Sequence, residues 1–246
     1  MAALNLTTLN LPHLPPNSHN VHIAVLKEIR NAEHLRSQLL AGNDDYEYAF
    51  IDASNIISTK HILVAVFKAL RGVVEGSDGG PGGLRTRNVH SEIVFSLSPN
   101  NNISESFTRF GIVDKTRNLI AIKVEVLTAD RTTPTTSLSA DAVRQFLATT
   151  VEFGESLPFT DEALYGVSDL ETVQQRYKYL AINKEVGVVG KAGIKGRQGK
   201  KKSADVAQNT SGIGDAQKQK WGEGGEDIQK DLEVWVIGAM VMKIVG

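Results

Sequence analysis

Four basic side chains recur at helical spacing within one predicted helix, which spans residues 54–72. They are Lys60, His61, Lys68 and Arg71. The same helix has an apolar stripe on its other side, formed by Ile56, Leu63, Val66, Phe67 and Leu70. Cationic side chains can contact phosphate groups and a flat imidazole can stack on a base, so the basic stripe is a candidate nucleic-acid contact. The alternative is a solvated helix face, which charged residues commonly form.

Elsewhere, no segment carries a complete motif for catalysis or cofactor binding. Residues 187–191 look like part of a phosphate-binding loop, but the GxxxxGK[ST] spacing is missing and Ala192 stands where a hydroxyl would hold magnesium. The glycine-rich segment 76–83 lacks the flanking strand and helix of a dinucleotide site. The six histidines form no HExxH pattern, and no GxSxG elbow presents a serine. We therefore expect no catalytic residue, metal or cofactor, and a binding role is favoured.

Six basic residues fall between Lys191 and Lys202 with no acidic residue among them. Two interpretations are open for this run. It can be a solvated linker, or it can act as a nuclear-import signal or a weak contact with a polyanion. Neither interpretation needs a folded site.

The composition is typical of a soluble globular protein. Hydrophobic residues make up 41% and charged residues 22% of the 246 residues, and the formal net charge of -1 indicates no particular partner. Cysteine is absent, which excludes disulfides and thiolate chemistry. The N-terminus lacks the pattern of a secretory signal, and the apolar run 234–245 is shorter than the roughly 20 residues of a membrane helix. We expect a soluble, intracellular protein.

The hydrophobic pattern predicts a single α/β domain in which a small mixed sheet packs with several helices. Strands are predicted over 21–26, 46–51, 89–97 and 119–127. The helices besides 54–72 are predicted over 31–39, 102–110, 139–151, 168–177 and 232–245, with Asn31, Asn102, Ser139 and Ser168 as N-caps and Gly42 as a stop. Residues 89–127 would form a β-α-β unit.

Two segments are expected to form neither helix nor strand. Residues 1–19 are rich in Pro, Asn and Thr and predict a flexible lead-in before a domain that spans 20–246. Residues 187–226 contain few apolar side chains and predict a disordered insertion within that domain. The helix after the insertion is apolar nearly all round, so it must lie in the core or against a partner.

Residues 88–112, NVHSEIVFSLSPNNNISESFTRFGI, closely resemble the core motif of a known family. This is the family of the kinase-binding subunit of the KEOPS (EKC) complex, known in animals as the PRPK-binding protein. Residues 60–71 and 119–126 are also similar to it, and 169–180 and the last helix are similar more loosely. The chain departs from the family in its long glycine-rich loop at 73–84 and in the insertion at 187–226.

The resemblance implies a subunit without an active site that binds the small lobe of the complex's kinase-like ATPase subunit. It implies that the subunit helps to recruit tRNA by holding its single-stranded acceptor tail. The complex installs threonylcarbamoyl on an adenosine beside the anticodon, through a separate transferase subunit that is reached via the kinase-like one. In fungi the complex is also linked to telomere maintenance. Nucleus and cytoplasm are the expected locations.

On this basis we assign candidate residues to each contact. The partner-binding candidates are Val236, Ala239, Met240 and, through its stem, Lys243. The tRNA candidates are Lys60, His61, Lys68 and Arg71, with Arg109 as a more distant addition. Two other hypotheses stay open: a free-standing RNA-binding module, and a hydrolase or transferase whose acid-base pair is not visible in one sequence.

Overall fold

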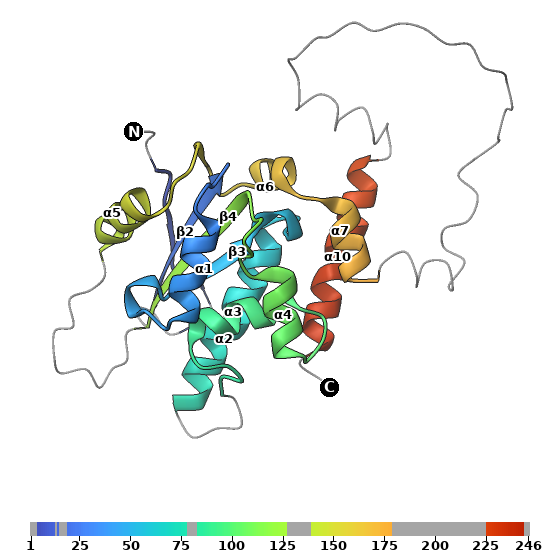
Figure 1. Ribbon diagram of the computed structural model, residues 1–246. Helices are drawn as coiled ribbons and strands as arrows, with labels where there is room; N and C mark the ends of the chain where they lie inside the picture. The colour runs from blue at the N-terminus through green and yellow to red at the C-terminus, as the bar shows by residue number, and fades with distance from the viewer. Residues whose placement is uncertain are drawn as a thin grey trace, which may run out of the picture.

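An antiparallel sheet forms the centre of the molecule. The computed structural model describes residues 4–12, 14, 19–77, 83–126, 139–178 and 225–243. Strand β2 (His19–Lys27) pairs with β4 (Asn118–Val126) along its whole length, with Ile23 opposite Ile122. β1 (Thr7–Leu9) and β5 (Glu155–Leu157) also pair with β2, and β3 (Ala49–Asp52) pairs with β4. The five-stranded sheet therefore has the order β1-β2-β4-β3, with β5 beside β2 (Figure 1).

Helices cover both faces of this sheet, because β2 is apolar on both sides. Ile23 and Val25 belong to one hydrophobic cluster, and Ala24 and Leu26 belong to a second cluster on the opposite face. The helices and short 3₁₀ turns are α1 (Ala32–Leu40), η1 (Asp44–Tyr46), η2 (Ala53–Asn55), α2 (Thr59–Ser77), α3 (Val89–Leu97), α4 (Ile103–Phe110), α5 (Ala140–Thr150), α6 (Asp161–Val167), α7 (Leu170–Arg176) and α10 (Gly225–Met242). α1 and α5 pack on the second cluster, and α2, α3, α7 and α10 pack on the first. The predicted single α/β domain is confirmed.

The β-α-β unit predicted at 89–127 is wrong, because Val89–Leu97 is an α-helix. The side chain of Asn88 caps this helix by accepting from the backbone N–H of Ser91 at 2.8 Å. Ile93, Phe95 and Leu97 have the two-residue spacing of a strand's buried side, and burial of nearly every residue of α3 hides its helical period. Residues 89–126 form two helices followed by a strand that pairs antiparallel with both neighbours.

The N-terminal segment also differs from its prediction as a flexible lead-in over 1–19. Within it, β1 pairs with β2 and Leu4 is buried in the second cluster. Alternation of leucine with polar residues gives this segment an apolar side, and pairing with β2 satisfies its backbone.

Most of the predicted insertion at 187–226 lies outside the described residues, and its last two residues begin α10.

Most predicted helix ends are close to the observed ones. Asn102 and Ser139 cap α4 and α5 as predicted, and Gly42 has the positive φ of 71° expected of a helix stop. Asp169, rather than Ser168, caps α7. The longest shift is in α10, which begins at Gly225, seven residues before its predicted start at 232. α2 begins at Thr59 and passes its predicted end at Gly72 to reach Ser77. Among the described helices, none is long and apolar enough to cross a membrane.

Candidate functional site

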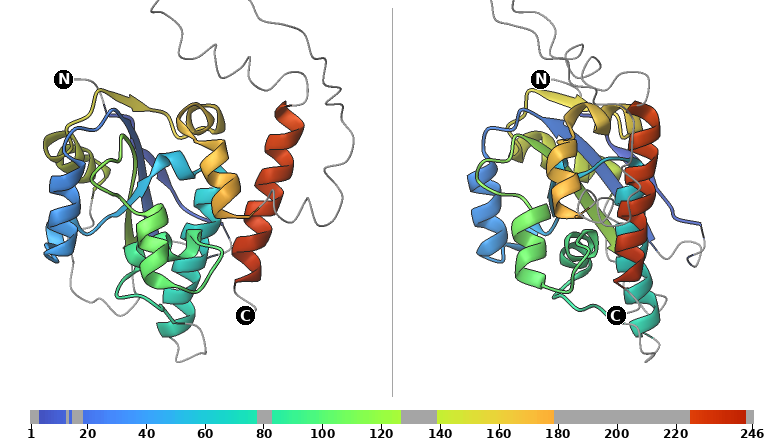
Figure 2. Two further views of the ribbon diagram at one scale, coloured as in Figure 1. Left: turned by 45° about the vertical axis from the view of Figure 1, so that its right-hand side comes forward. Right: turned by 90° about the vertical axis from the view of Figure 1, so that its right-hand side faces the viewer.

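α10 lies along α2 on the side that carries the predicted basic stripe. The Nζ atom of Lys60 is 3.1 Å from Oε2 of Glu233, and Nζ of Lys68 donates to the carbonyl oxygen of Met240 at 2.8 Å. Glu233 and Met240 both belong to α10. Both views in Figure 2 show α10 running beside α2 and α7. The basic stripe and the terminal apolar helix, two separate candidates in the sequence, therefore meet in one seam between α2 and α10.

His61 lies in the core, so its prediction as a stacking surface for a base is wrong. Its side chain has no exposed area, and its Nε2 lies 2.8 Å from the hydroxyl of Tyr177. That hydroxyl donates to the carbonyl oxygen of Leu97, so Nε2 of His61 is the donor to Tyr177. Burial lowers the pKa of His61 to about 3, and the imidazole is neutral. The helical wheel misplaced His61 because Ala65 and Ala69 extend the buried side of α2 to its position.

Replacing Tyr177 with phenylalanine is expected to lower the free energy of unfolding by about 2 kcal/mol, because the substitution leaves a buried N–H of His61 and a buried carbonyl without partners. Urea denaturation measures this loss. Tyr165→Phe is the matched control, since Tyr165 is only partly buried on α6. Equal stability of the Tyr177→Phe and Tyr165→Phe variants would show that the bridge between His61 and Leu97 does not stabilise the fold.

The remaining basic candidates do not join the seam between α2 and α10 as one cluster. Arg71 is exposed near the end of α2. Arg109 lies on α4, where it forms an ion pair with Glu105 one turn earlier. The charge of Arg109 also acts on Arg176 of α7. The pKa of Arg176 is lowered by burial and by the charge of Arg109. Two cationic positions, Lys60 and Arg71, are exposed on α2, and Arg109 belongs to a different surface.

The inward side of α10 contains the residues that were predicted to bind a partner. Val236 and Met240 have no exposed area, Lys243 is 7% exposed, and Ala239 is partly buried against the first cluster. These side chains pack on α2, α3 and the residues around Tyr177, so the prediction that they contact a partner is corrected. The spacing of Leu232, Val236 and Met240 at every fourth residue is the signal that marks this inward side.

The outward side of α10 carries apolar side chains that the protein itself does not cover. Val234 is 71%, Val241 44% and Met242 69% exposed. They account for half of the large apolar side chains exposed in the described residues, the others being Leu40, Ile103 and Phe107. Because α10 is apolar nearly all round, the sequence did not distinguish its inward from its outward side. We call Val234, Val241 and Met242 the outward face of α10.

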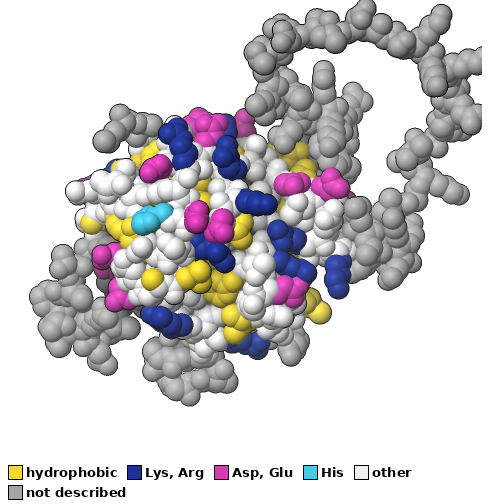
Figure 3. Space-filling view, in the orientation of Figure 1, with side chains coloured by type: hydrophobic (Ala, Val, Ile, Leu, Met, Phe, Trp, Pro, Cys, Tyr) yellow, Lys and Arg dark blue, Asp and Glu magenta, His cyan; other side chains and the backbone are white. Residues whose placement is uncertain are grey.

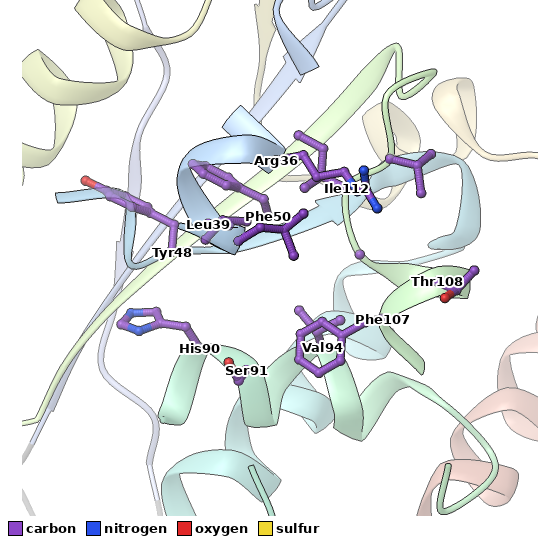
Figure 4. A pocket seen from close by; sticks show the side chains of 13 residues that line it. Arg36, Leu39, Tyr48, Phe50, His90, Ser91, Val94, Phe107, Thr108 and Ile112 are labelled. Carbon is purple, nitrogen blue, oxygen red and sulfur yellow. The ribbon is translucent and has the colours of Figure 1, made fainter. Parts of the chain in front are cut away.

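A second apolar feature is a cavity of about 260 Å³ between α1, β3, α3 and α4. Figure 3 shows hydrophobic side chains gathered on this face between α1 and α4, and Figure 4 shows the lining side chains, among them Leu39, Phe50 and Phe107. No carboxylate is among the residues that line this cavity. His90 lies at its edge, but its Nε2 accepts from the backbone N–H of Val124 at 3.0 Å. The cavity suits an apolar group better than acid-base chemistry.

In the part of the chain that the structure describes, no group of three or more His, Cys, Asp and Glu side chains could hold a metal ion. The features that stand out in the described residues are two surfaces and a cavity. They are the outward face of α10, the exposed cations of α2, and the apolar cavity beside α4.

A family model described as "Kinase binding protein CGI-121" matches residues 26–244 of the chain. The chain is 45% identical over 178 residues to a protein of Aspergillus terreus named EKC/KEOPS complex subunit cgi121. The aligned residues are 72% of this chain and 82% of that protein. A Neurospora crassa protein with the same name is 38% identical over 200 residues, and the alignment covers 78% of this chain and 91% of that protein. A Schizosaccharomyces pombe protein, again named EKC/KEOPS complex subunit cgi121, is 29% identical over 168 residues, covering 68% and 86%.

Proposed function

Because the chain belongs to the CGI-121 family of kinase-binding proteins, we propose that it is a non-catalytic subunit of an EKC/KEOPS complex. In this proposal it binds the complex's kinase-like ATPase subunit, and through it the threonylcarbamoyl transferase subunit. The observation that carries the proposal is the outward face of α10, which exposes Val234, Val241 and Met242 to solvent. Large apolar side chains exposed along one side of a helix are the kind of feature that protein partners cover.

The inward side of α10 supports this interface because it fixes the helix on the domain. Leu232, Val236 and Met240 are fully buried, and Nε1 of Trp235 donates to the carbonyl oxygen of Tyr177 at 3.0 Å. A partner that covers the outward face therefore meets a surface that is already ordered. Pre-organisation of this kind reduces the entropy lost on binding.

We propose that the complex uses this subunit to recruit tRNA by its acceptor tail. Lys60 and Arg71 are exposed on α2, and Arg109 is accessible on α4, so these cations can contact phosphate groups. His61 has no part in the proposal because it is buried. With so few exposed cations on α2 and a net charge of -1, the isolated chain is expected to bind RNA weakly and to bind it better beside the other subunits.

Neutralising the exposed cations of α2 tests this part of the proposal. The double variant Lys60→Gln and Arg71→Gln should weaken tRNA binding by the assembled complex by about tenfold, and it should flatten the salt dependence of the affinity. Lys27→Gln is the matched control, because Lys27 also forms a surface ion pair, with Glu155 at 3.5 Å, but lies on β2. Fluorescence anisotropy with labelled tRNA at several salt concentrations measures both effects.

The same titration distinguishes the adaptor from a free-standing RNA-binding module. Tight, salt-sensitive binding by the isolated chain, unchanged when the kinase-like subunit is added, would favour the free-standing module. Unchanged affinity of the Lys60→Gln and Arg71→Gln variant in the complex would remove α2 from the proposed RNA contact.

A role in telomere maintenance, and residence in nucleus and cytoplasm, are further parts of the proposal that depend on the same assembly.

A further inference from the structure

A small polar pocket of about 150 Å³ lies where α2, α3 and the C-terminal end of α10 meet. Three cationic side chains line it: Lys68 from α2, Arg85 from the segment before α3, and Lys243 directly after α10. Glu92 of α3 is the one carboxylate among the lining residues. When all three cations are protonated, the one negative charge of Glu92 leaves the pocket with two positive charges in excess.

None of these three cations forms an ion pair in the described residues. Nζ of Lys243 donates to the carbonyl oxygen of Phe95 at 2.5 Å and lies 3.4 Å from the centre of the Phe95 ring. Lys68 donates to a backbone carbonyl of α10 at 2.8 Å, and Arg85 donates to the amide oxygen of Asn101 at 3.1 Å. Each of these side-chain partners is neutral, and each ammonium has two further N–H donors.

The carboxylate of Glu92 is already occupied by other donors. Its Oε2 accepts from the backbone N–H of Arg85 at 3.0 Å, and from the backbone N–H and the hydroxyl of Thr86 at 2.9 and 2.8 Å. Glu92 thus holds the segment before α3 in place and only partly offsets the surrounding positive charge.

This arrangement is unfavourable without an anion. Lys243 is 7% exposed, and burial together with the charges of Lys68 and Arg85 lowers its pKa to about 7. Burial and the charge of Arg85 also lower the pKa of Lys68, against the opposing effect of Glu92. Buried cations that repel one another destabilise a fold, and such groups gather where a protein binds an opposite charge.

We propose that this pocket binds a phosphate dianion, either inorganic phosphate or the terminal phosphate of a monoester, held by Lys68, Arg85 and Lys243. The two excess positive charges match a dianion, and the unused N–H donors of the three side chains suit its oxygen atoms. A phosphodiester carries one negative charge and presents two esterified oxygens, so it fits less well. The proposal does not depend on the kinase-like partner or on tRNA binding.

Binding at this position would join three elements of the fold. Lys68, Arg85 and Lys243 come from α2, the segment before α3, and the end of α10, so one phosphate would hold the end of α10 against the domain. Phosphate would also favour the charged form of Lys243, whose neutral form prevails in the empty pocket above about pH 7. Binding at about pH 8 is therefore expected to take up a proton.

Isothermal titration calorimetry of the full chain at about pH 8 tests the proposal, with sodium chloride keeping the ionic strength constant. Inorganic phosphate should bind at least about tenfold more tightly than dimethyl phosphate, a diester with one charge. Lys243→Met and Lys68→Met, which keep most of the apolar stem, should each weaken phosphate binding by about tenfold or more. Lys27→Met is the control on β2, outside the pocket, and should leave the affinity within about twofold.

Titration in two buffers with different ionisation enthalpies measures the proton uptake. The wild type should take up a proton with phosphate, and Lys243→Met should not. Lack of phosphate binding by the folded wild type, or equal affinity for phosphate and dimethyl phosphate, would overturn the proposal. The same holds if Lys27→Met weakens binding as much as Lys243→Met. Because the comparison of the two phosphates uses only the wild type, misfolded variants would leave the test intact.

Discussion

Val234→Arg combined with Val241→Arg is expected to weaken binding to the kinase-like ATPase subunit at least about 100-fold. Both side chains are exposed, at 71% and 44%, on the outward face of α10. In the bound state the substitutions would place two charges without partners inside an apolar interface. Arginine has a higher helix propensity than valine, so α10 itself should persist.

Surface plasmon resonance against the immobilised kinase-like subunit measures this loss of affinity, and circular dichroism confirms that the variant is folded. Leu40→Arg is the matched control, because Leu40 is 73% exposed on α1, on the other side of the domain from α10 (Figure 1). If the double variant bound as tightly as wild type while Leu40→Arg did not, the partner surface would lie beside α1 and the cavity of Figure 4.

Glu92→Ala is expected to cause the largest loss of stability of the substitutions considered, about 3 kcal/mol or more. The substitution leaves the backbone N–H groups of Arg85 and Thr86 without their acceptor. It also removes the one carboxylate from a pocket that contains Lys68, Arg85 and Lys243. A loss of 1 kcal/mol lowers the melting temperature of a domain of this size by roughly 2–4 °C. The melting temperature of Glu92→Ala should therefore be roughly 6–12 °C below that of the wild type.

Differential scanning calorimetry measures this shift, with Glu152→Ala as a control at an exposed position between α5 and β5. Adding Lys243→Met to Glu92→Ala should restore part of the lost stability, because it removes one of the cations that the carboxylate offsets. If Lys243→Met added its own further loss instead, charge imbalance in the pocket would not be the cause of the effect of Glu92→Ala.

The sequence predicts the elements of this fold that have one buried side. The helix at 102–110 and the helix at 139–151 each alternate polar and apolar residues at the period of a helix, and each was located within a few residues. α3 was misread as a strand because Ile93, Phe95 and Leu97 lie two positions apart, as on one side of a strand, and burial of every residue but Ser91 hides the helical period. Its cap by Asn88 was the available local signal for a helix.

The site was predictable in its elements but not in its orientation. The sequence singles out α2 and the last helix as candidates, yet it does not show that they pack against each other. Because α10 covers one side of α2, Lys60 and Lys68 contact α10, and Val236 and Met240 lie in the core. Contacts between residues about 170 positions apart leave no trace in local periodicity, so only the three-dimensional structure distinguishes the inward from the outward side of α10.

The same limit explains why the sequence did not predict the proposed phosphate pocket. Lys68, Arg85 and Lys243 are distributed over three elements, and in the sequence each is an ordinary basic residue near acidic or apolar neighbours. Their convergence on one pocket beside the carboxylate of Glu92 appears only when α10 is packed against α2 and α3. Binding sites assembled from separate elements are in general less visible in a sequence than contiguous motifs.

The central claim is that this chain binds the kinase-like ATPase subunit directly, and co-expression with that subunit from the same organism tests it. Size-exclusion chromatography with light scattering then gives the mass of the eluted species. We predict that the two proteins elute together with the mass of a stoichiometric pair. Two folded proteins that elute separately, each at its own mass, would contradict the claim.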